Sequence, residues 1–267
     1  HGKGRTFEIP DFSRRHDEIG DLSVALREMT EALWTRLDAI EGFAADVAHE
    51  IKNPLTSLRS AVETVVRVED PEQQKRLMSI ILDDVQRLDR LISDISGASR
   101  LDAELSRTES EPVDIGSLLR NLVEAQNATA PDDSPRLRLQ IANRSDLMVS
   151  GMEDRLGQVM RNLVNNAITF SPPGGEIVLG ARAEGPWVVM TVSDEGPGIP
   201  DAKLNAIFDR FYTERPSSEK FATHSGLGLS ISKQIVEAHG GTIFAENRVD
   251  GHGKTCGARF TVRLPKG

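Results

Sequence analysis

The sequence predicts an α-helical rod followed by an α+β domain, and three observations lead to this prediction. Between residues 19 and 103 there are only three glycines and two prolines, whereas the whole chain has 22 and 13. Apolar residues in this first part recur at steps of three and four, the period of a helix that packs on another helix. After residue 110, short apolar runs alternate with helical patterns and glycine-rich turns, which is typical of helices laid on a sheet.

Length, charge and cysteine content limit what the protein can be. A chain of 267 residues suggests about two domains. An apolar fraction of 38% with 27% charged residues indicates a folded, soluble protein. The net charge of −9 argues against a general nucleic-acid binder, so no direct nucleic-acid partner is expected. The single cysteine, Cys256, excludes an internal disulfide framework and a Cys-based zinc cluster. No run approaches about 18 apolar residues, so we expect neither a membrane span nor a secretory signal in this chain.

The rod carries a heptad pattern from residue 22 to residue 51. Its apolar residues are spaced by threes and fours, with one doubled step of four between Leu33 and Leu37. This doubled step is a stutter, which locally unwinds a coiled coil. An amphipathic helix packed on its own protein shows similar spacing over short spans, but about four heptads favour a coiled-coil or bundle seam. The seam residues are Leu22, Leu26, Met29, Leu33, Leu37, Ile40, Ala44, Val47 and Ile51.

A second helix is predicted to begin after residue 70. Asp70 suits the N-cap, Pro71 suits the first helical position, and Gln73 suits the other half of a capping box. Two helices joined near residues 69–70 make an antiparallel hairpin, and one hairpin alone leaves half of its seam exposed. We therefore expect a homodimer in which two hairpins form a four-helix bundle. The apolar stripe of this helix is Leu77, Ile81, Val85, Leu88, Ile92 and Ile95.

The α+β domain is predicted to follow a charged linker at residues 107–111. Its helices are expected to lie on one face of a sheet, and the last helix ends at Gly240-Gly241. The expected helices are 116–128, 154–167 and 227–238. The expected strands are 136–142, 176–183, 187–193, 242–247 and 257–264, with turns at 184–186 and at 250–251.

His49 is the first residue that points to chemistry. Counting heptads from the apolar seam places His49 at the position furthest from it, where the ring is exposed. Asn53 lies four residues on, along the same helical face, and Pro54 is expected to bend the helix beside the histidine. Glu50 can accept a hydrogen bond from one ring nitrogen, which leaves the other with the free lone pair that a nucleophile requires.

Two other interpretations of this segment exist. A zinc protease would need a second histidine at position 53, where this chain has Asn53, and no third ligand is apparent. The plainer alternative is that His49 and Glu50 form an ordinary solvated pair. The segment by itself leaves that alternative open.

Several residues of the α+β domain suit a nucleotide. Asn162 and Asn166 lie four apart on one helix, and their amide oxygens suit Mg²⁺ and the phosphates that it bridges. Asp194 follows a strand and can accept from an exocyclic amine, while Gly196 and Gly198 let the backbone approach a flat base. Each signal is weak by itself, because a Gly-x-Gly at a turn is more often only a turn.

A second glycine-rich segment opens the helix expected at 227–238. It contains Gly226, Leu227 and Gly228, and the free N–H groups of a helix start attract phosphate. Residues 201–223 lie between the two glycine-rich segments and include a polar run that suits a lid. The aromatic stretch 207–212 is more simply a hydrophobic anchor. The chain has neither a Walker lysine motif nor a Gly-x-Gly-x-x-Gly after a strand, which disfavours P-loop and Rossmann sites.

In this order and spacing, these blocks resemble those of sensor histidine kinases. His49-Glu50-Ile51-Lys52-Asn53-Pro54-Leu55 resembles the H box, and residues 162–167, 194–199, 207–212 and 226–229 resemble the N, first glycine, F and second glycine boxes. Residues 15–37 resemble the second helix of a HAMP linker. The amino-acid sequence of residues 45–48 and 55–61 is similar to that of the ChvG/ExoS-type kinases of alphaproteobacteria.

The resemblance implies a domain order and a setting. Residues 1–37 would be a partial HAMP linker, 38–105 a helical hairpin for dimerisation and histidine phosphotransfer, and 111–267 a Bergerat-type ATP-binding α+β sandwich. The chain would be the cytoplasmic portion of an inner-membrane sensor protein, joined to the membrane only through a part upstream of residue 1. Its partners would be a second copy of itself and a response regulator of the OmpR type.

The resemblance also implies roles for the residues near the histidine. His49 would take the γ-phosphoryl group of ATP, with Glu50 as its base. Asn53 would position water when the protein dephosphorylates its partner. The expected function is therefore an ATP-dependent autokinase that passes its phosphoryl group to an aspartate of the response regulator.

At the nucleotide, the resemblance implies a second set of roles. Asn166 would hold Mg²⁺, with Asn162 nearby, and Asp194 would bind the adenine amine. The other residues that it places at the nucleotide are Gly196, Gly198, Arg210, Gly226, Leu227 and Gly228.

Three positions depart from the family pattern. Thr169 and Thr213 stand where the family often has basic residues, although Arg210 or Arg215 could serve, and His224 stands where a glycine is frequent. These departures keep two rivals open: a nucleotide-binding regulator or phosphatase without kinase activity, and a coiled-coil scaffold with a degenerate ATP domain. A chaperone or topoisomerase ATPase of the same fold gives no reason for the helix that carries His49.

Overall fold

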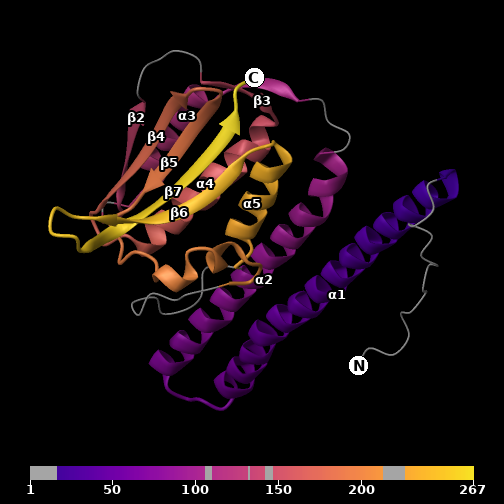
Figure 1. Ribbon diagram of the computed structural model, residues 1–267. Coiled ribbons are helices and arrows are strands. Elements are labelled where there is room, and N and C mark those ends of the chain that lie inside the picture. The colour runs from indigo at the N-terminus through magenta and orange to yellow at the C-terminus, as the bar shows by residue number, and fades with distance from the viewer. Residues whose placement is uncertain (1–16, 106–109, 132, 142–146, 213–225) are drawn as a thin grey trace. The chain divides into compact units, whose positions relative to one another are not determined.

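A computed structural model describes residues 17–105, 110–131, 133–141, 147–212 and 226–267. The chain divides into two compact units, residues 1–56 and 57–267. Two long helices come first and a mixed α/β arrangement follows, so the predicted order of a helical part and an α+β part is confirmed. Figure 1 labels these elements.

The rod is a single helix, α1, which runs from Glu18 to Val65. Asp17 begins it, because the Asp17 carboxylate accepts from the Gly20 amide at 3.1 Å. The helix contains Pro54 and continues through it to Val65. The predicted rod is therefore one uninterrupted helix over the HAMP-like residues and the segment that carries His49.

The second helix, α2, runs from Pro71 to Leu105, as predicted from its first residue. Asp70 is the N-cap, since its Oδ1 accepts from the Glu72 amide at 3.1 Å. The expected capping box is not completed by Gln73. Gln74 instead donates from Nε2 to the carbonyl of Val68 at 2.7 Å, and this bond holds the short link between the two helices.

Five strands form the main sheet in the order β2-β4-β5-β7-β6. β2 pairs parallel with β4, and all the other neighbours pair antiparallel. The predicted strands are confirmed with small changes at their ends. The bounds are β2 Arg136–Ile141, β4 Glu176–Glu184, β5 Trp187–Ser193, β6 Thr242–Val249 and β7 Thr255–Pro265.

Two short strands were not predicted. β1 (Glu111–Asp114) and β3 (Met148–Gly151) pair antiparallel in a separate two-stranded sheet. The predicted end of the linker at residue 111 is therefore wrong, because Glu111 is the first residue of β1. Four-residue strands carry too little alternation to be recognised before their partner is known.

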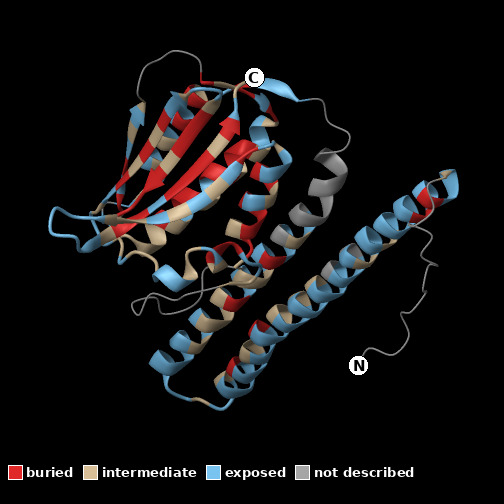
Figure 2. Cartoon of the chain, in the orientation of Figure 1, coloured by how far each residue is buried: buried red, intermediate tan, exposed pale blue. Residues whose placement is uncertain are grey.

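Three helices cover one face of the main sheet, as predicted (Figure 1). They are α3 (Ile115–Thr129), α4 (Glu153–Phe170) and α5 (Gly228–Ala238). The core lies between these helices and the sheet, and the buried residues of both are coloured red in Figure 2. Two short 3-10 helices, Asp201–Lys203 and Ala206–Phe208, follow β5. Of the helices in the described part of the chain, none has the length and apolarity needed to cross a membrane.

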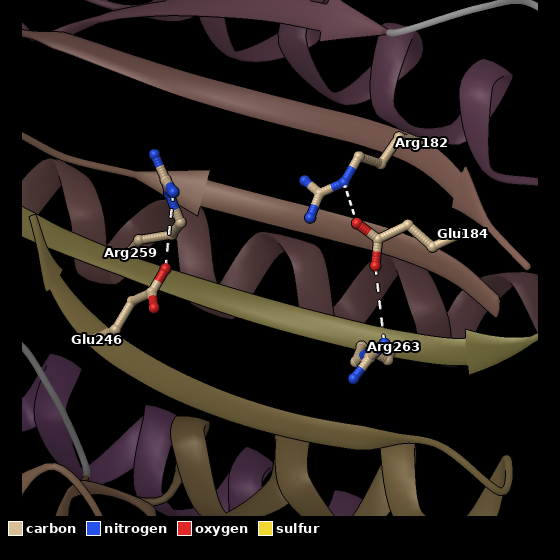
Figure 3. Close-up of polar contacts among 5 residues, drawn as sticks. All are labelled: Arg182, Glu184, Glu246, Arg259 and Arg263. Carbon is tan, nitrogen blue, oxygen red and sulfur yellow. Dashed lines mark hydrogen bonds and ion pairs between the residues drawn. The ribbon is translucent and has the colours of Figure 1, made fainter.

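The other face of the sheet carries charged side chains (Figure 3). Glu184 lies between two arginines, 2.6 Å from Arg182 Nε and 3.6 Å from Arg263 Nη2. Arg259 Nη1 lies 3.6 Å from Glu246 Oε1. These side chains are all partly exposed, so each pair contributes at most about 1 kcal/mol to stability.

Candidate functional site

His49 lies on α1 and is exposed, as the heptad count predicts. Asn53, one turn on, is exposed too. The ring of His49 makes no hydrogen bond with the described residues, so the structure does not show the expected bond to Glu50. The reason is geometric, because adjacent residues of a helix do not face each other. Both ring nitrogens of His49 are therefore open to a reaction partner.

Asn162 and Asn166 lie on one face of α4, but their surroundings differ. Asn162 Nδ2 donates to the carbonyl of Gly228 at 3.0 Å and lies 3.3 Å from Ser232 Oγ, so this amide links α4 to the start of α5. Asn166 is half-buried, and its side chain makes no hydrogen bond with any described residue. Its amide oxygen therefore fits a hard cation such as Mg²⁺, and the oxygen of Asn162 is likewise left without a donor in the described chain.

A second link joins α4 and α5 at the opposite end of α5. The Met152 amide donates to His239 Nε2 at 3.1 Å, and His239 Nδ1 lies 2.7 Å from the carbonyl of Ile235. The ring therefore carries its proton on Nδ1, since Nε2 must accept. With Asn162 at the other end, α5 is fixed to α4 along its length.

Asp194 follows β5 and is buried, with 3% of its surface exposed. One carboxylate oxygen, Oδ1, accepts from the amides of Gly196 at 2.9 Å and Ala258 at 3.0 Å. The other oxygen, Oδ2, has no donor among the residues that the structure describes. A buried acceptor with an open lone pair fits an exocyclic amine such as that of adenine.

The surroundings of Asp194 also change its acidity. Burial raises the pKa of the Asp194 carboxyl above its ordinary value, because the charged form loses its hydration. The hydrogen bonds from Ala258 and Gly196 and the positive charge of Arg248 act in the opposite direction without cancelling this effect. The carboxylate is therefore held in a site where its charge is costly unless a donor meets Oδ2.

Glycine is required beside Asp194. Gly257 on β7 has φ +143°, and a Cβ atom there would lie 2.0 Å from the Asp194 carbonyl oxygen. Gly198 has φ +79°, and its Cβ would lie 2.3 Å from Thr255 Cγ2. Both positions allow the backbone of residues 194–198 to lie against the β6–β7 hairpin. Gly196, also expected at the nucleotide, lies here because its amide bonds Asp194.

The second glycine-rich segment lies at the start of α5. Gly226 has φ +72°, and its carbonyl accepts from the Phe211 amide at 2.9 Å, which joins this segment to the end of the aromatic stretch. Leu227 is buried, and Gly228 is the first residue of α5. Arg210 is exposed on the aromatic stretch. The structure thus places the predicted nucleotide residues in one domain, on β5, α4 and α5 and the segments beside them.

Two of the three departures from the family pattern fall outside the described residues, namely Thr213 and His224, and so does Arg215. The third, Thr169, is described: its Oγ1 donates to the carbonyl of Asn165 at 2.9 Å on the same helix. This hydroxyl caps a backbone group and supplies no positive charge to a phosphate.

Sequence reasoning missed two residues of β6 that contact the segment after β5. Asn247 bonds the backbone of Ile199, and Arg248 Nη1 donates to the carbonyl of Asp194 at 2.5 Å. Nothing near them in the sequence marks these contacts. The one local signal is Gly257, since a glycine within a strand pattern indicates a close backbone approach.

Two family profiles match this chain in the order of its two parts. The family described as "His Kinase A (phospho-acceptor) domain" matches residues 39–104. The family described as "Histidine kinase-, DNA gyrase B-, and HSP90-like ATPase" matches residues 151–267.

Relatives and solved structures give the same result. Sensor protein ChvG of Rhizobium meliloti (strain 1021) is 54% identical over 266 residues, which is 97% of this chain and 46% of that protein. Sensor protein ChvG of Agrobacterium fabrum (strain C58) is 52% identical over 264 residues, 97% of this chain and 44% of that protein. The crystal structure of histidine kinase ThkA in complex with response regulator protein TrrA aligns with a TM-score of 0.67 at 27% identity, covering 90% of this chain and 66% of that chain.

A phospho-acceptor helical domain followed by this type of ATPase domain is the arrangement of a histidine kinase, and the chain belongs to that family. Within the family it is a ChvG-like histidine kinase, as the identities over 97% of its length indicate. The resemblance stated from the motifs is thereby confirmed. The chain spans less than half the length of these two ChvG proteins.

Proposed function

We propose that this chain is the catalytic part of an ATP-dependent protein-histidine kinase that phosphorylates itself on His49. Two features carry the proposal: an exposed histidine with an unbonded ring lies on one helix of the chain, and a buried carboxylate with an open oxygen lies in its ATPase domain. The first suits a nucleophile and the second suits an adenine.

ATP is the substrate of the α+β domain in this proposal. Asp194 accepts the adenine amine at Oδ2, Gly196 and Gly198 leave room for the base, and the start of α5 at Gly226, Leu227 and Gly228 faces the phosphates. Arg210 adds positive charge there. Asn166, with Asn162 nearby, would hold Mg²⁺, and the bound ion would supply positive charge to the phosphate oxygens.

The residues of α1 carry out the transfer. One ring nitrogen of His49 attacks the γ-phosphorus, so a P–N bond forms while the bond to the oxygen bridging to the β-phosphate breaks, and ADP leaves. In this proposal Glu50 is the base that takes the proton from the imidazole, which requires its side chain to turn toward the ring, since the two are not bonded in the structure. Alignment of the two reacting atoms supplies most of the acceleration, because little other chemistry is required.

The phosphoryl group then passes to an aspartate of a separate response regulator, for which we propose the OmpR type. The complex of ThkA with TrrA supports a partner of this class, since that related kinase is bound to a response regulator protein. We also propose that the chain dephosphorylates its partner, with Asn53 positioning the attacking water.

A homodimer is part of the proposal. The seam of α1 is unusually apolar for a surface, with Leu22 68% exposed, Met29 65% and Leu33 55%. A continuous apolar stripe of this kind is normally covered by another helix. We further propose that the chain is the cytoplasmic portion of a larger membrane-linked sensor, with residues 1–37 as part of a HAMP linker.

The test is incubation of the full chain with radiolabelled ATP and Mg²⁺. Wild type should take up label that is labile in acid and stable in base, and His49→Gln should take up none while still binding nucleotide. His252→Gln is the matched control, because His252 is exposed in the β6–β7 turn and has no part in the proposal. If wild type binds nucleotide but takes up no label, the alternative of a nucleotide-binding regulator without kinase activity is favoured. The lack of a positive charge at Thr169 is the observation that supports this alternative. A chain that binds no nucleotide would favour the rival scaffold.

A further inference from the structure

Asn247 on β6 binds the segment from Asp194 to Asp201, which we name the Asp194 loop. Its Oδ1 accepts from the Ile199 amide at 2.7 Å, and its Nδ2 donates to the Ile199 carbonyl at 2.6 Å. The same Nδ2 donates to Asp201 Oδ1 at 3.1 Å. Asn247 therefore satisfies both backbone groups of one loop residue, as a neighbouring strand would, although it lies 48 residues further along the chain.

Arg248, the next residue, binds the other end of the same loop. Its Nη1 donates to the carbonyl of Asp194 at 2.5 Å. Arg248 pairs with Gly257 across the hairpin, and the register of β6 and β7 shifts between Arg248 and Val249. An irregularity of this kind redirects side chains, and Gly257 leaves the space through which the Asp194 backbone approaches.

Two consecutive β6 residues thus hold the first residue of the Asp194 loop and the sixth. Between them lie Gly196 and Gly198, which have no side chains to fix the loop by packing. Pro197 and Pro200 restrict the loop, but a glycine loses the most conformational freedom on ordering, so Gly196 and Gly198 depend on external contacts to hold one shape.

We propose that Asn247 and Arg248 are positioning residues for nucleotide binding, which hold the Asp194 loop in the shape that presents Asp194 to the base of the nucleotide. This inference rests on the proposed function, because it takes the loop to bind ATP. The proposal predicts that much of the affinity for nucleotide depends on Asn247 and Arg248 of β6, although neither side chain contacts the nucleotide.

Arg248 has a second effect in this proposal, through its charge. Among the described residues, Arg248 is the one whose positive charge lowers the pKa of the Asp194 carboxyl. The other charged groups around the loop have other partners: Glu195 Oε2 accepts from the Glu176 amide, Arg259 binds Ser193 and Glu246, and Asp201 binds Asn247. Removing the charge of Arg248 should therefore raise the pKa of Asp194 further, and the pH below which nucleotide binding is lost should rise.

The experiment uses the full chain, trinitrophenyl-ATP as the fluorescent probe and unfolding temperature as the measure of folding. Asn247→Ala should weaken probe binding about tenfold, because the loop loses three hydrogen bonds. Arg248→Met should weaken binding and move the acid limb of the binding profile to higher pH, and Arg248→Lys should return that limb toward wild type. Arg263→Met is the matched control on the outer face of the sheet and should change neither.

A second pair of variants keeps the test valid if Asn247→Ala unfolds. Asn247→Asp keeps the side-chain shape but sets two carboxylates against each other at Asp201, so binding should weaken. Combining it with Asp201→Asn removes that repulsion and should recover part of the affinity. Amide exchange at Ile199 without nucleotide should be faster in Asn247→Ala than in wild type, which reports the loop directly.

The outcomes separate this proposal from the proposed function. If wild type binds the probe and Asn247→Ala and Arg248→Met fold and bind it equally well, the positioning role is overturned while the kinase proposal stands. Lower unfolding temperatures with unchanged affinity would overturn it as well, because the residues would then be only structural. If wild type itself binds no nucleotide, the proposed function fails first.

Discussion

The two parts of this chain bury their apolar side chains to very different extents (Figure 2). In the α+β domain, Leu119, Leu163 and Val192 are 0% exposed. On α1, Leu22 is 68% exposed and Leu33 55%, although both belong to one heptad seam. The α+β domain completes its core from its own elements, whereas among the described residues of one chain none covers Leu22 and Leu33 of the α1 seam.

This difference separates two kinds of stability. A domain with a closed core is held by burial within one chain, so its stability does not depend on concentration. A helix whose stripe is covered by another molecule is stabilised by association and therefore becomes more stable as concentration rises. The four predictions below test this comparison, from the largest expected effect to the smallest.

The largest effect is expected for Leu163→Ala in α4. The substitution leaves a cavity in the closed core and should lower the free energy of unfolding by about 2–5 kcal/mol. Thermal unfolding of the full chain would measure it. Leu33→Ala on α1 is the matched control and should cost well under about 1 kcal/mol in dilute solution. Equal losses for the two variants would contradict the comparison.

Asp194→Asn should separate binding from folding within the α+β domain. The carboxamide still offers an oxygen to the Gly196 and Ala258 amides, but it sets a donor against the adenine amine. Affinity should fall about a hundredfold, or about 2.7 kcal/mol. Nucleotide titration would measure this change.

The stability of the same variant follows from the sign of the pKa shift. Burial raises the pKa of Asp194 in the folded state above its ordinary value of 3.8. The stability that protonated Asp194 contributes is therefore present below pH 3.8 and is lost as the pH rises through the raised pKa of the folded state. At neutral pH the buried charge is therefore a cost, so Asp194→Asn should not unfold more easily than wild type. In wild type, nucleotide affinity should fall as pH drops through the raised pKa. A variant that loses stability at neutral pH would contradict this account.

Leu26→Asp combined with Leu33→Asp should act on the helical part alone. Charges on the seam oppose a second helix, so the dissociation constant of the proposed dimer should rise at least about tenfold, as measured by sedimentation at several concentrations. Val24→Asp is the control, because Val24 is exposed but lies off the seam. Nucleotide binding should be unchanged in both. A chain that sediments as a monomer in every form would refute the dimer.

The smallest effect is expected on the outer face of the sheet. Arg182→Met breaks the 2.6 Å pair with Glu184, yet both side chains are 40% or more exposed. The free energy of unfolding should change by less than about 1 kcal/mol, because exposed ion pairs are screened by water. A chemical denaturation curve in low and high salt would measure it. A larger loss would mean that this face holds the domain together.

Much of the fold could be predicted from the sequence because its elements have local signals. The period of three and four predicts α1, the Asp70-Pro71 start predicts α2, and short apolar runs set between helical patterns and glycine-rich turns predict the five main strands. β1 and β3 escaped because each has four residues and exists only through the other. The capping bond of Gln74 also escaped, since Gln73 has the standard spacing and Gln74 reaches the link instead.

The candidate site divides in the same way. The exposure of His49 and the position of Asp194 after a strand follow from local patterns, and both are found in the structure. The expected hydrogen bond from a ring nitrogen of His49 to Glu50 is absent, and the amide of Asn162 donates to α5. The first difference follows from the adjacency of the two residues, because neighbours on a helix do not face each other. The second could not be read from motif spacing, because it depends on what lies across from Asn162.

By itself, the sequence determined the long helices, the five strands of the main sheet, and which side chains can donate or accept. Only the tertiary structure decided which distant groups meet, such as Asp194 with the amide of Ala258, 64 residues away, and Ile199 with Asn247. The physical reason is that a helix or strand follows from interactions between near neighbours, whereas contacts across a sheet depend on strand order and register. Those are set by the burial of the whole core at once, and no short segment contains that information.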